Sequence, residues 1–244
     1  MTWLRGRHAV EESLRARARG VRELWVLSGL QAEHIKELIG LARGAGARVR
    51  YVSKNELDRL GPGHQGLAAR VGEKPAAGLE EWLAGLSAEA KKSAVLVALD
   101  QIQDPHNLGA IARAASCLGG VALLVPDRRS APVSPAAVQA SAGAIEKIPV
   151  LNVGNLAQAL EKLKGEGFWV YGADMSGKPC WETRLNFPLV LVIGSEGAGL
   201  RALVRERCDE LVAVPQSAGG VASLNASTAA AVLLYEAARQ ARPA

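Results

Sequence analysis

The chain has 244 residues, of which 49% are hydrophobic and 22% charged, a balance that suits one large folded domain or two modest ones. No apolar run approaches the roughly 20 residues that a bilayer span needs, and the first 20 residues lack the apolar stretch of a secretory signal. The sequence therefore does not suggest a membrane or secreted protein, and we expect a cytoplasmic one.

The net charge of +5 is unevenly distributed. Residues 1–75 hold 14 Lys and Arg against 8 Asp and Glu, so this segment carries the whole surplus. A role in keeping the protein soluble explains such a surplus of positive charge as well as a role in RNA binding does. Its confinement to one segment favours a polyanionic partner.

The first third of the chain alternates between helix and strand patterns. Helices are expected over 8–18 and 31–42, with a short helix after the capping-box pattern at 53–56. Strands are expected over 22–28, 48–53 and 66–71. The prediction is a compact α/β domain over residues 1–72, followed by a linker over 73–93 that contains one short helix near 79–83.

Arginine dominates the cations of this first domain, and its planar guanidinium suits phosphate groups. Aromatic residues make up only 4% of the chain, so base stacking is not expected to dominate RNA binding. The residues expected to bind RNA are Arg5, Arg7, Arg15, Arg17, Arg19 and Arg22.

A second α/β series fills residues 94–244. Its first strand, 94–100, is almost entirely apolar, as expected of a strand buried on both faces of a parallel sheet. Further strands are expected over 121–125, 148–151, 168–173, 189–193 and 211–214, and helices over 108–117, 135–142, 156–164 and 223–240. This alternation predicts a parallel, doubly wound sheet.

Three loops should meet beyond the carboxyl ends of these strands, where open α/β sheets bind ligands. The first follows residue 100, where Asp104 or Asn107 is expected to cap a helix whose first two turns hold Asn107 and Arg113. An amide and a guanidinium together suit a phosphate and a ribose hydroxyl. A simple N-cap with a surface arginine is the structural alternative for each residue alone.

The second loop, 194–200, is rich in glycine and carries one carboxylate, Glu196. Its glycine order is neither that of a dinucleotide site nor that of a P-loop, and it lacks the nucleophile elbow of hydrolases. The third loop, 215–225, precedes an alanine-rich helix that Ser223 or Asn225 should cap.

Together, in this order, the three segments resemble the SpoU family of RNA 2'-O-methyltransferases. The segment SAGA at 141–144 is also similar to that family, and GRHAV at 6–10 and HQG at 64–66 resemble a ribosomal-protein-like substrate-binding domain. That domain is found in the subgroup that methylates a guanosine ribose of 23S rRNA. One departure is the loop 215–223, which is one residue longer than is usual.

The resemblance implies a catalytic domain with a deep trefoil knot that binds S-adenosylmethionine and forms a homodimer through its C-terminal domain. It implies catalytic roles for Asn107, Arg113, Glu196, Ser223 and Asn225. It implies a cofactor site formed by Gly172, Ala173, Gly194, Val214, Pro215 and Leu224.

Other interpretations remain open from the sequence. The RNA could be tRNA, and a cofactor-free RNA-binding protein is the non-enzymatic alternative. Pro179-Cys180 is similar to the nucleophile context of cytosine-C5 methyltransferases, although the rest of that pattern is absent. Three widely spaced cysteines suit a reducing compartment, and no metal site is expected.

Overall fold

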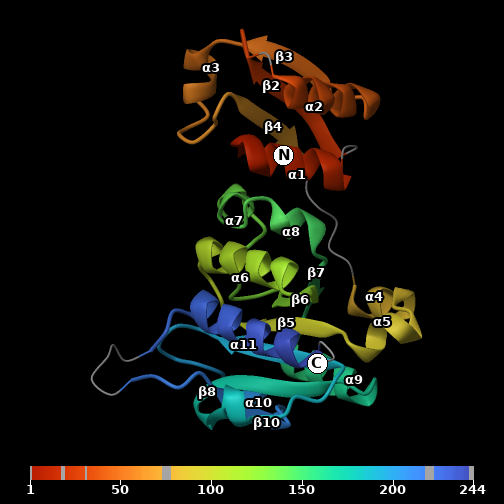
Figure 1. Ribbon diagram of the computed structural model, residues 1–244, viewed down its shortest axis with the longest axis vertical. Helices are drawn as coiled ribbons and strands as arrows, with labels where there is room; N and C mark the ends of the chain where they lie inside the picture. Colours follow the sequence, from red (N-terminus) through yellow and green to blue (C-terminus); the bar gives the residue numbers. More distant parts are fainter. Residues whose placement is uncertain (1, 18–19, 31, 73–77, 218–222, 242–244) are drawn as a thin grey trace.

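The computed structural model describes residues 2–17, 20–30, 32–72, 78–217 and 223–241, and within them the chain forms two sheets (Figure 1). The smaller sheet belongs to the N-terminal domain and is mixed, because β4 runs antiparallel to both of its neighbours while β2 and β3 are parallel. Its strands, in spatial order, are β1 (Thr2–Arg5), β4 (Leu67–Val71), β2 (Val21–Leu27) and β3 (Arg48–Val52).

Helices cover the two faces of this small sheet unequally. Two long helices, α1 (Arg7–Arg17) and α2 (Glu33–Gly44), contribute Leu14 and Leu38 to the core on one face. Among the described residues, only the short helix α3 (Lys54–Asp58) packs on the other face, where Leu57 belongs to a small cluster. The capping box predicted at 53–56 is present, with both the Ser53 and Glu56 side chains engaged.

The larger sheet has six strands, all parallel, in the order β10-β8-β9-β5-β6-β7. Alternate residues of its strands enter different cores, with Val97 on one face and Leu96 on the other. The strands are β5 (Val95–Asp100), β6 (Gly120–Pro126), β7 (Val150–Val153), β8 (Trp169–Pro179), β9 (Leu189–Gly194) and β10 (Glu210–Ala213).

Helices lie on both faces of this sheet, so the predicted doubly wound α/β fold is confirmed. On one face lie α6 (Pro105–Cys117), α7 (Pro135–Ala140), α8 (Ala144–Lys147) and α11 (Ala226–Ala241). On the other lie α4 (Leu79–Gly85), α9 (Leu156–Gly165) and α10 (Ala202–Glu206). The chain also forms α5 (Ala88–Lys92) and the 3-10 helix η2 (Cys180–Glu182). No helix in the described ranges has the length and apolarity of a membrane span.

The N-terminal domain rests on the helices that cover α6 (Figure 1). Helix α1 contacts α8, and β1 contacts α7. The contact is close at Gly143, where a Cβ atom would lie 2.5 Å from the Cβ of Glu12, and the Glu12 carboxylate pairs with Lys147 at 2.6 Å. Helix α7 in turn crosses α6 so tightly that a Cβ at Gly109 would lie 2.5 Å from the Ala137 carbonyl oxygen.

Several element boundaries differ from the sequence-based expectation. Helix α6 begins at Pro105 rather than near residue 108, because the Asp104 side chain accepts a hydrogen bond from the His106 amide and caps the helix. Strand β8 continues to Pro179, six residues beyond the predicted end. Strand β1 and helices α5, α8 and α10, each of four or five residues, were not predicted. The trefoil knot stays a prediction.

Candidate active site

The three polar loops follow three parallel strands, β5, β9 and β10, and leave the large sheet at one edge. Asp100, the last residue of β5, is in register with Gly194, the last residue of β9. Strand β10, which precedes the third loop, joins the same sheet through β8. The shared direction of the strands therefore brings segments that are far apart in sequence to one edge.

A hydrogen-bonded network joins one residue from each loop. The Asn107 side-chain amide donates to Glu196 Oε1 at 2.8 Å, and the Asn225 amide donates to Asn107 Oδ1 at 3.0 Å. The Asn225 amide also contacts Glu196 Oε1. Asn225 Oδ1 accepts from the Ser227 amide at 2.9 Å, so this residue caps α11 and its orientation is fixed. A carboxylate accepting two amide donors holds the three loops in a defined arrangement.

A cavity of about 250 Å³ opens beside this network. Main-chain atoms and small or apolar side chains form much of its wall, with Glu196 and Ser223 among the polar residues. Its remaining wall includes Ala173, Ile193, Gly194, Val214, Leu224 and Leu233. Such a pocket suits a mixed apolar and polar small molecule that is recognised through backbone groups.

Glycine is required where β9 turns into the second loop. A Cβ at Gly194 would lie 2.3 Å from the carbonyl carbon of Gly199, so a side chain has no space there. Ser195 and Gly199 exchange backbone hydrogen bonds of 3.2 and 2.9 Å, which close the loop into a tight turn. Gly197 and Gly199 have φ angles of 79° and 67°, in the region that favours glycine. The turn presents Glu196 toward α6.

The far end of the second loop is fastened by a buried carboxylate. Asp100 is fully buried and accepts hydrogen bonds from the Arg201 backbone amide at 2.8 Å and from Arg201 Nε at 2.7 Å. Since Asp100 also begins the first loop, one residue connects the backbone of the Asn107 loop with that of the Glu196 loop. The sequence-based interpretation did not single out this residue.

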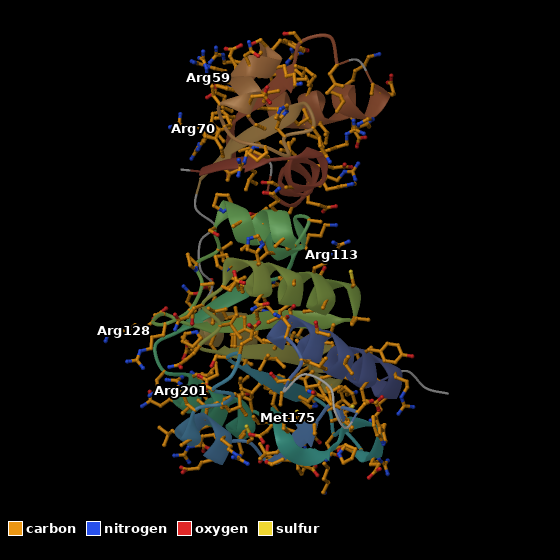
Figure 2. The ribbon with its side chains drawn as sticks, turned by 90° about the vertical axis from the view of Figure 1, so that its left-hand side faces the viewer. Arg59, Arg70, Arg113, Arg128, Met175 and Arg201 are labelled. Atoms are coloured by element: carbon orange, nitrogen blue, oxygen red, sulfur yellow. The ribbon has the colours of Figure 1, made fainter. Side chains whose placement is uncertain are left out.

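Not every predicted site residue lies in the network or the cavity wall. Arg113 lies in the third turn of α6, not within the first two turns as predicted, because the helix begins earlier. Its side chain is exposed, and Figure 2 shows it on the side opposite Arg128 and Arg201 in that view. Gly172 adjoins the wall residue Ala173 but packs inward, since a Cβ there would lie 2.7 Å from Cys208 Sγ. Pro215 follows the wall residue Val214 and does not itself line the cavity.

Family models match both parts of the chain. The model described as "SpoU rRNA Methylase family" matches residues 94–235, and "RNA 2'-O ribose methyltransferase substrate binding" matches residues 3–76. The chain belongs to the SpoU rRNA methylase family. The family resemblance read from the three loop motifs is thereby confirmed.

Relatives of this SpoU chain match it nearly end to end. It is 41% identical to the 23S rRNA (guanosine-2'-O-)-methyltransferase RlmB of Pseudomonas aeruginosa, with 98% of this chain and 96% of that protein covered. It is also 41% identical to the RlmB of Xanthomonas campestris, with the same coverage. The crystal structure of the SpoU methyltransferase AviRb from Streptomyces viridochromogenes in complex with AdoMet matches with a TM-score of 0.79 and 27% identity, covering 98% of this chain and 89% of that one.

Another SpoU structure matches a smaller share of the chain. The A. aeolicus TrmH/SpoU tRNA modifying enzyme is 28% identical with a TM-score of 0.53, and the match covers 61% of this chain and 75% of that one. The AviRb structure therefore matches a larger share of this chain than the tRNA modifying enzyme does.

The SpoU cavity contains residues that sequence reasoning missed. Asp174, Met175 and Gln216 line it, and the first two lie on the unpredicted extension of β8. Burial raises the pKa of the Asp174 carboxyl, but hydrogen bonds from Ser176 and the nearby Arg205 outweigh burial, so the pKa lies below its usual value. Gln216 Nε2 donates to Met175 Sδ at 3.4 Å across the cavity rim. No spacing signal in the sequence connects these residues.

Proposed function

We propose that this chain transfers a methyl group from S-adenosylmethionine to the ribose 2'-hydroxyl of a guanosine in 23S rRNA. The observation that carries this proposal is the network of Asn107, Glu196 and Asn225 at the rim of a small-molecule cavity. The full-length similarity to two RlmB enzymes supports 23S rRNA as the substrate. The AdoMet complex of AviRb supports the cofactor.

The residues present suit S-adenosylmethionine. Gly194, Val214 and Leu224 offer main-chain groups for an adenine edge, and we propose that Ala173, with its neighbours Gly172 and Pro215, completes that wall. Two carboxylates at the cavity, Glu196 and Asp174, are compatible with a positively charged ligand. When bound, the cofactor supplies a methyl group that its sulfonium already activates for transfer.

The protein then has to orient a ribose 2'-hydroxyl, whose proton passes to a substrate phosphate or to water. We assign Asn107, Glu196 and Asn225 to holding the loops, and Ser223 to the polar wall where the ribose enters. The Arg113 side chain is exposed and forms no ion pair or hydrogen bond within the described ranges, which suits a residue that binds a substrate phosphate. A guanidinium stays protonated in proteins, so we assign Arg113 a positioning role and not that of a general base.

Substituting lysine for Arg113 tests this assignment. Lysine keeps the charge but loses the planar fork, so turnover on 23S rRNA should fall by at least about tenfold. Near-normal turnover by Arg113→Lys contradicts the positioning role. Unchanged calorimetric affinity for S-adenosylmethionine is expected, because Arg113 does not line the cavity.

We further propose that residues 1–72 form the RNA-binding domain, 73–93 the linker and 94–244 the catalytic domain. We also propose that the catalytic domain forms a homodimer. Exposed large apolar side chains on α11 and on the adjoining η2 support a second copy as partner, since Tyr235 on α11 is 61% exposed and Trp181 on η2 is 60% exposed. Sedimentation velocity of the full chain tests the dimer directly.

Mapping 2'-O-methyl groups in total RNA, with and without the gene, tests the substrate. The expected result is the loss of one guanosine methylation in 23S rRNA. Loss of a methyl group in tRNA instead contradicts the rRNA assignment. If calorimetry detects no binding of S-adenosylmethionine, the alternative of a cofactor-free RNA-binding protein is favoured instead.

A further inference from the structure

Within the described ranges, one face of the N-terminal sheet is left largely uncovered, and we call it the open sheet face. The strand register puts Trp3 opposite Arg70, Arg70 opposite Glu23, and Trp25 opposite Arg50. Helices α1 and α2 cover the other face, and α3 covers only the end of this one. The open sheet face consists of Trp3, Arg5, Glu23, Trp25, Arg48, Arg50 and Arg70.

Two tryptophans lie side by side on the open sheet face. The ring centroids of Trp3 and Trp25 are 4.6 Å apart at 57°, and the Arg50 guanidinium lies 5.2 Å from the Trp25 ring centroid. Trp25 Nε1 donates to Glu23 Oε1 at 2.8 Å, which fixes the indole. Both rings are half-buried, with one side against Leu57 and its cluster. Rigid indoles with a neighbouring guanidinium suit the stacking of an unpaired base.

The side chains of two arginines of this face lack a partner among the described residues, whereas Arg50 has two. The side chains of Arg48 and Arg70 are exposed and form no ion pair or hydrogen bond with any residue that the structure describes. Arg50 lies 3.8 Å from Glu23, which is only 16% exposed, and 3.9 Å from Glu56 of α3, so its charge is compensated. The free guanidinium groups of Arg48 and Arg70, on the same face as the two indole rings, favour a polyanion that also presents flat rings.

Helix α1, where several RNA-binding arginines were predicted, is less suited. Arg15 pairs with Glu11 at 2.7 Å and with Glu37 at 3.6 Å, so its charge is compensated. The helix also packs against α8 of the catalytic domain. The side chain of Arg17 and the whole of Arg19 lie outside the described residues.

We infer that the open sheet face binds an unpaired stretch of RNA, with Arg48 and Arg70 on phosphates and a base stacked beside Trp25. The inference rests on the proposed function insofar as the substrate is RNA. Figure 2 shows Arg70 and Arg59 projecting to the same side as Arg128 and Arg201 of the catalytic domain. Arg201 follows the Glu196 loop, so RNA on this side extends toward the active-site edge.

The test compares Arg48→Ala/Arg70→Ala with Lys36→Ala/Arg43→Ala, a control that removes two exposed cations from α2 on the opposite face. Filter binding of a protein-free 23S rRNA transcript over a salt series is the measurement. The test variant should bind about tenfold more weakly, and its slope of log K against log salt should shrink by about 1.4, or roughly 0.7 for each lost phosphate contact. The control should retain wild-type affinity and slope. Equal affinities of the two variants overturn the inference.

Stacking is tested separately at Trp25. Trp25→Phe keeps a flat ring and should bind within about twofold of wild type, whereas Trp25→Leu should lose at least about fivefold, as for a base stacked on an aromatic side chain. Thermal melting checks that both variants fold. If both lose affinity equally while melting like wild type, the ring is not a stacking platform and that part of the inference fails.

The two proposals fail in distinguishable ways. If wild type methylates the transcript and Arg48→Ala/Arg70→Ala has an unchanged KM for RNA, the binding face is wrong and the methyltransferase proposal stands. If wild type transfers no methyl group but the same variant loses RNA affinity, the binding face stands and the proposed function is wrong.

Discussion

Replacing Arg201 by alanine should cost more stability than replacing its partner Asp100 by asparagine, although the arginine is the more exposed of the two. Arg201 is 44% exposed, whereas the Asp100 side chain is fully buried. Alanine at 201 leaves the buried carboxylate with one backbone donor, and an uncompensated buried charge costs about 3 kcal/mol. Asparagine at 100 retains an acceptor oxygen and removes the charge, so its cost should be about 1.5 kcal/mol.

Urea unfolding monitored by circular dichroism measures both costs. Lys164→Ala is the control, because the Lys164–Asp209 pair is similarly short at 2.8 Å but both side chains are partly exposed at 32% and 22%. A surface pair of this kind is worth at most about 1 kcal/mol. Calorimetry should also show weaker binding of S-adenosylmethionine by Arg201→Ala, by about tenfold, since the loop bearing Glu196 loses its anchor. If Arg201→Ala is no more destabilising than Lys164→Ala, the reasoning from the buried carboxylate is refuted.

Three further predictions follow from the site and the cysteines. Asn107→Ala should lower methyl transfer by about 10²-fold while the calorimetric affinity for S-adenosylmethionine changes little, because Asn107 does not line the cavity and Asn225 still contacts Glu196 and holds its loop; loss of cofactor binding would contradict this separation. Gly194→Ala should abolish cofactor binding in the same assay, because its Cβ would overlap the carbonyl carbon of Gly199, and normal binding would show that the turn is more adaptable than this contact implies. Burial raises the pKa of the Cys208 thiol to about 12, whereas Cys117 is exposed; iodoacetamide at pH 8 should therefore label Cys117 and spare Cys208, as peptide mass spectrometry of the native protein can verify.

Much of the catalytic fold could be predicted because its signals are local. A run such as Val95–Asp100 is apolar on both faces, which identifies a buried parallel strand without any knowledge of its neighbours. Capping also acts within a few residues, and Asn225 caps α11 as one of the two predicted alternatives. For α6 two residues were candidate N-caps and the sequence did not decide between them. The structure shows that Asp104, and not Asn107, caps the helix.

The convergence of the three loops could be predicted because parallel strands end at a common edge. The partners within that convergence could not, since Asn107 and Glu196 are 89 residues apart and no spacing rule relates them. Asp100 illustrates the limit most clearly. In the sequence it is only the polar end of a strand, and its role depends on a backbone amide 101 residues away.

The proposed RNA-binding surface likewise could not be predicted from amino-acid composition. An aromatic content of 4% argued against base stacking when averaged over the chain. Trp3 and Trp25 nevertheless come together, because β4 lies between β1 and β2 and pairs with both. The same pairing sets Arg70 between two strands that are separated in sequence. A stacking platform needs only two rings and a few free guanidinium groups on one surface, so the strand register, and not the abundance of aromatic residues, decides whether a small domain of this kind has one.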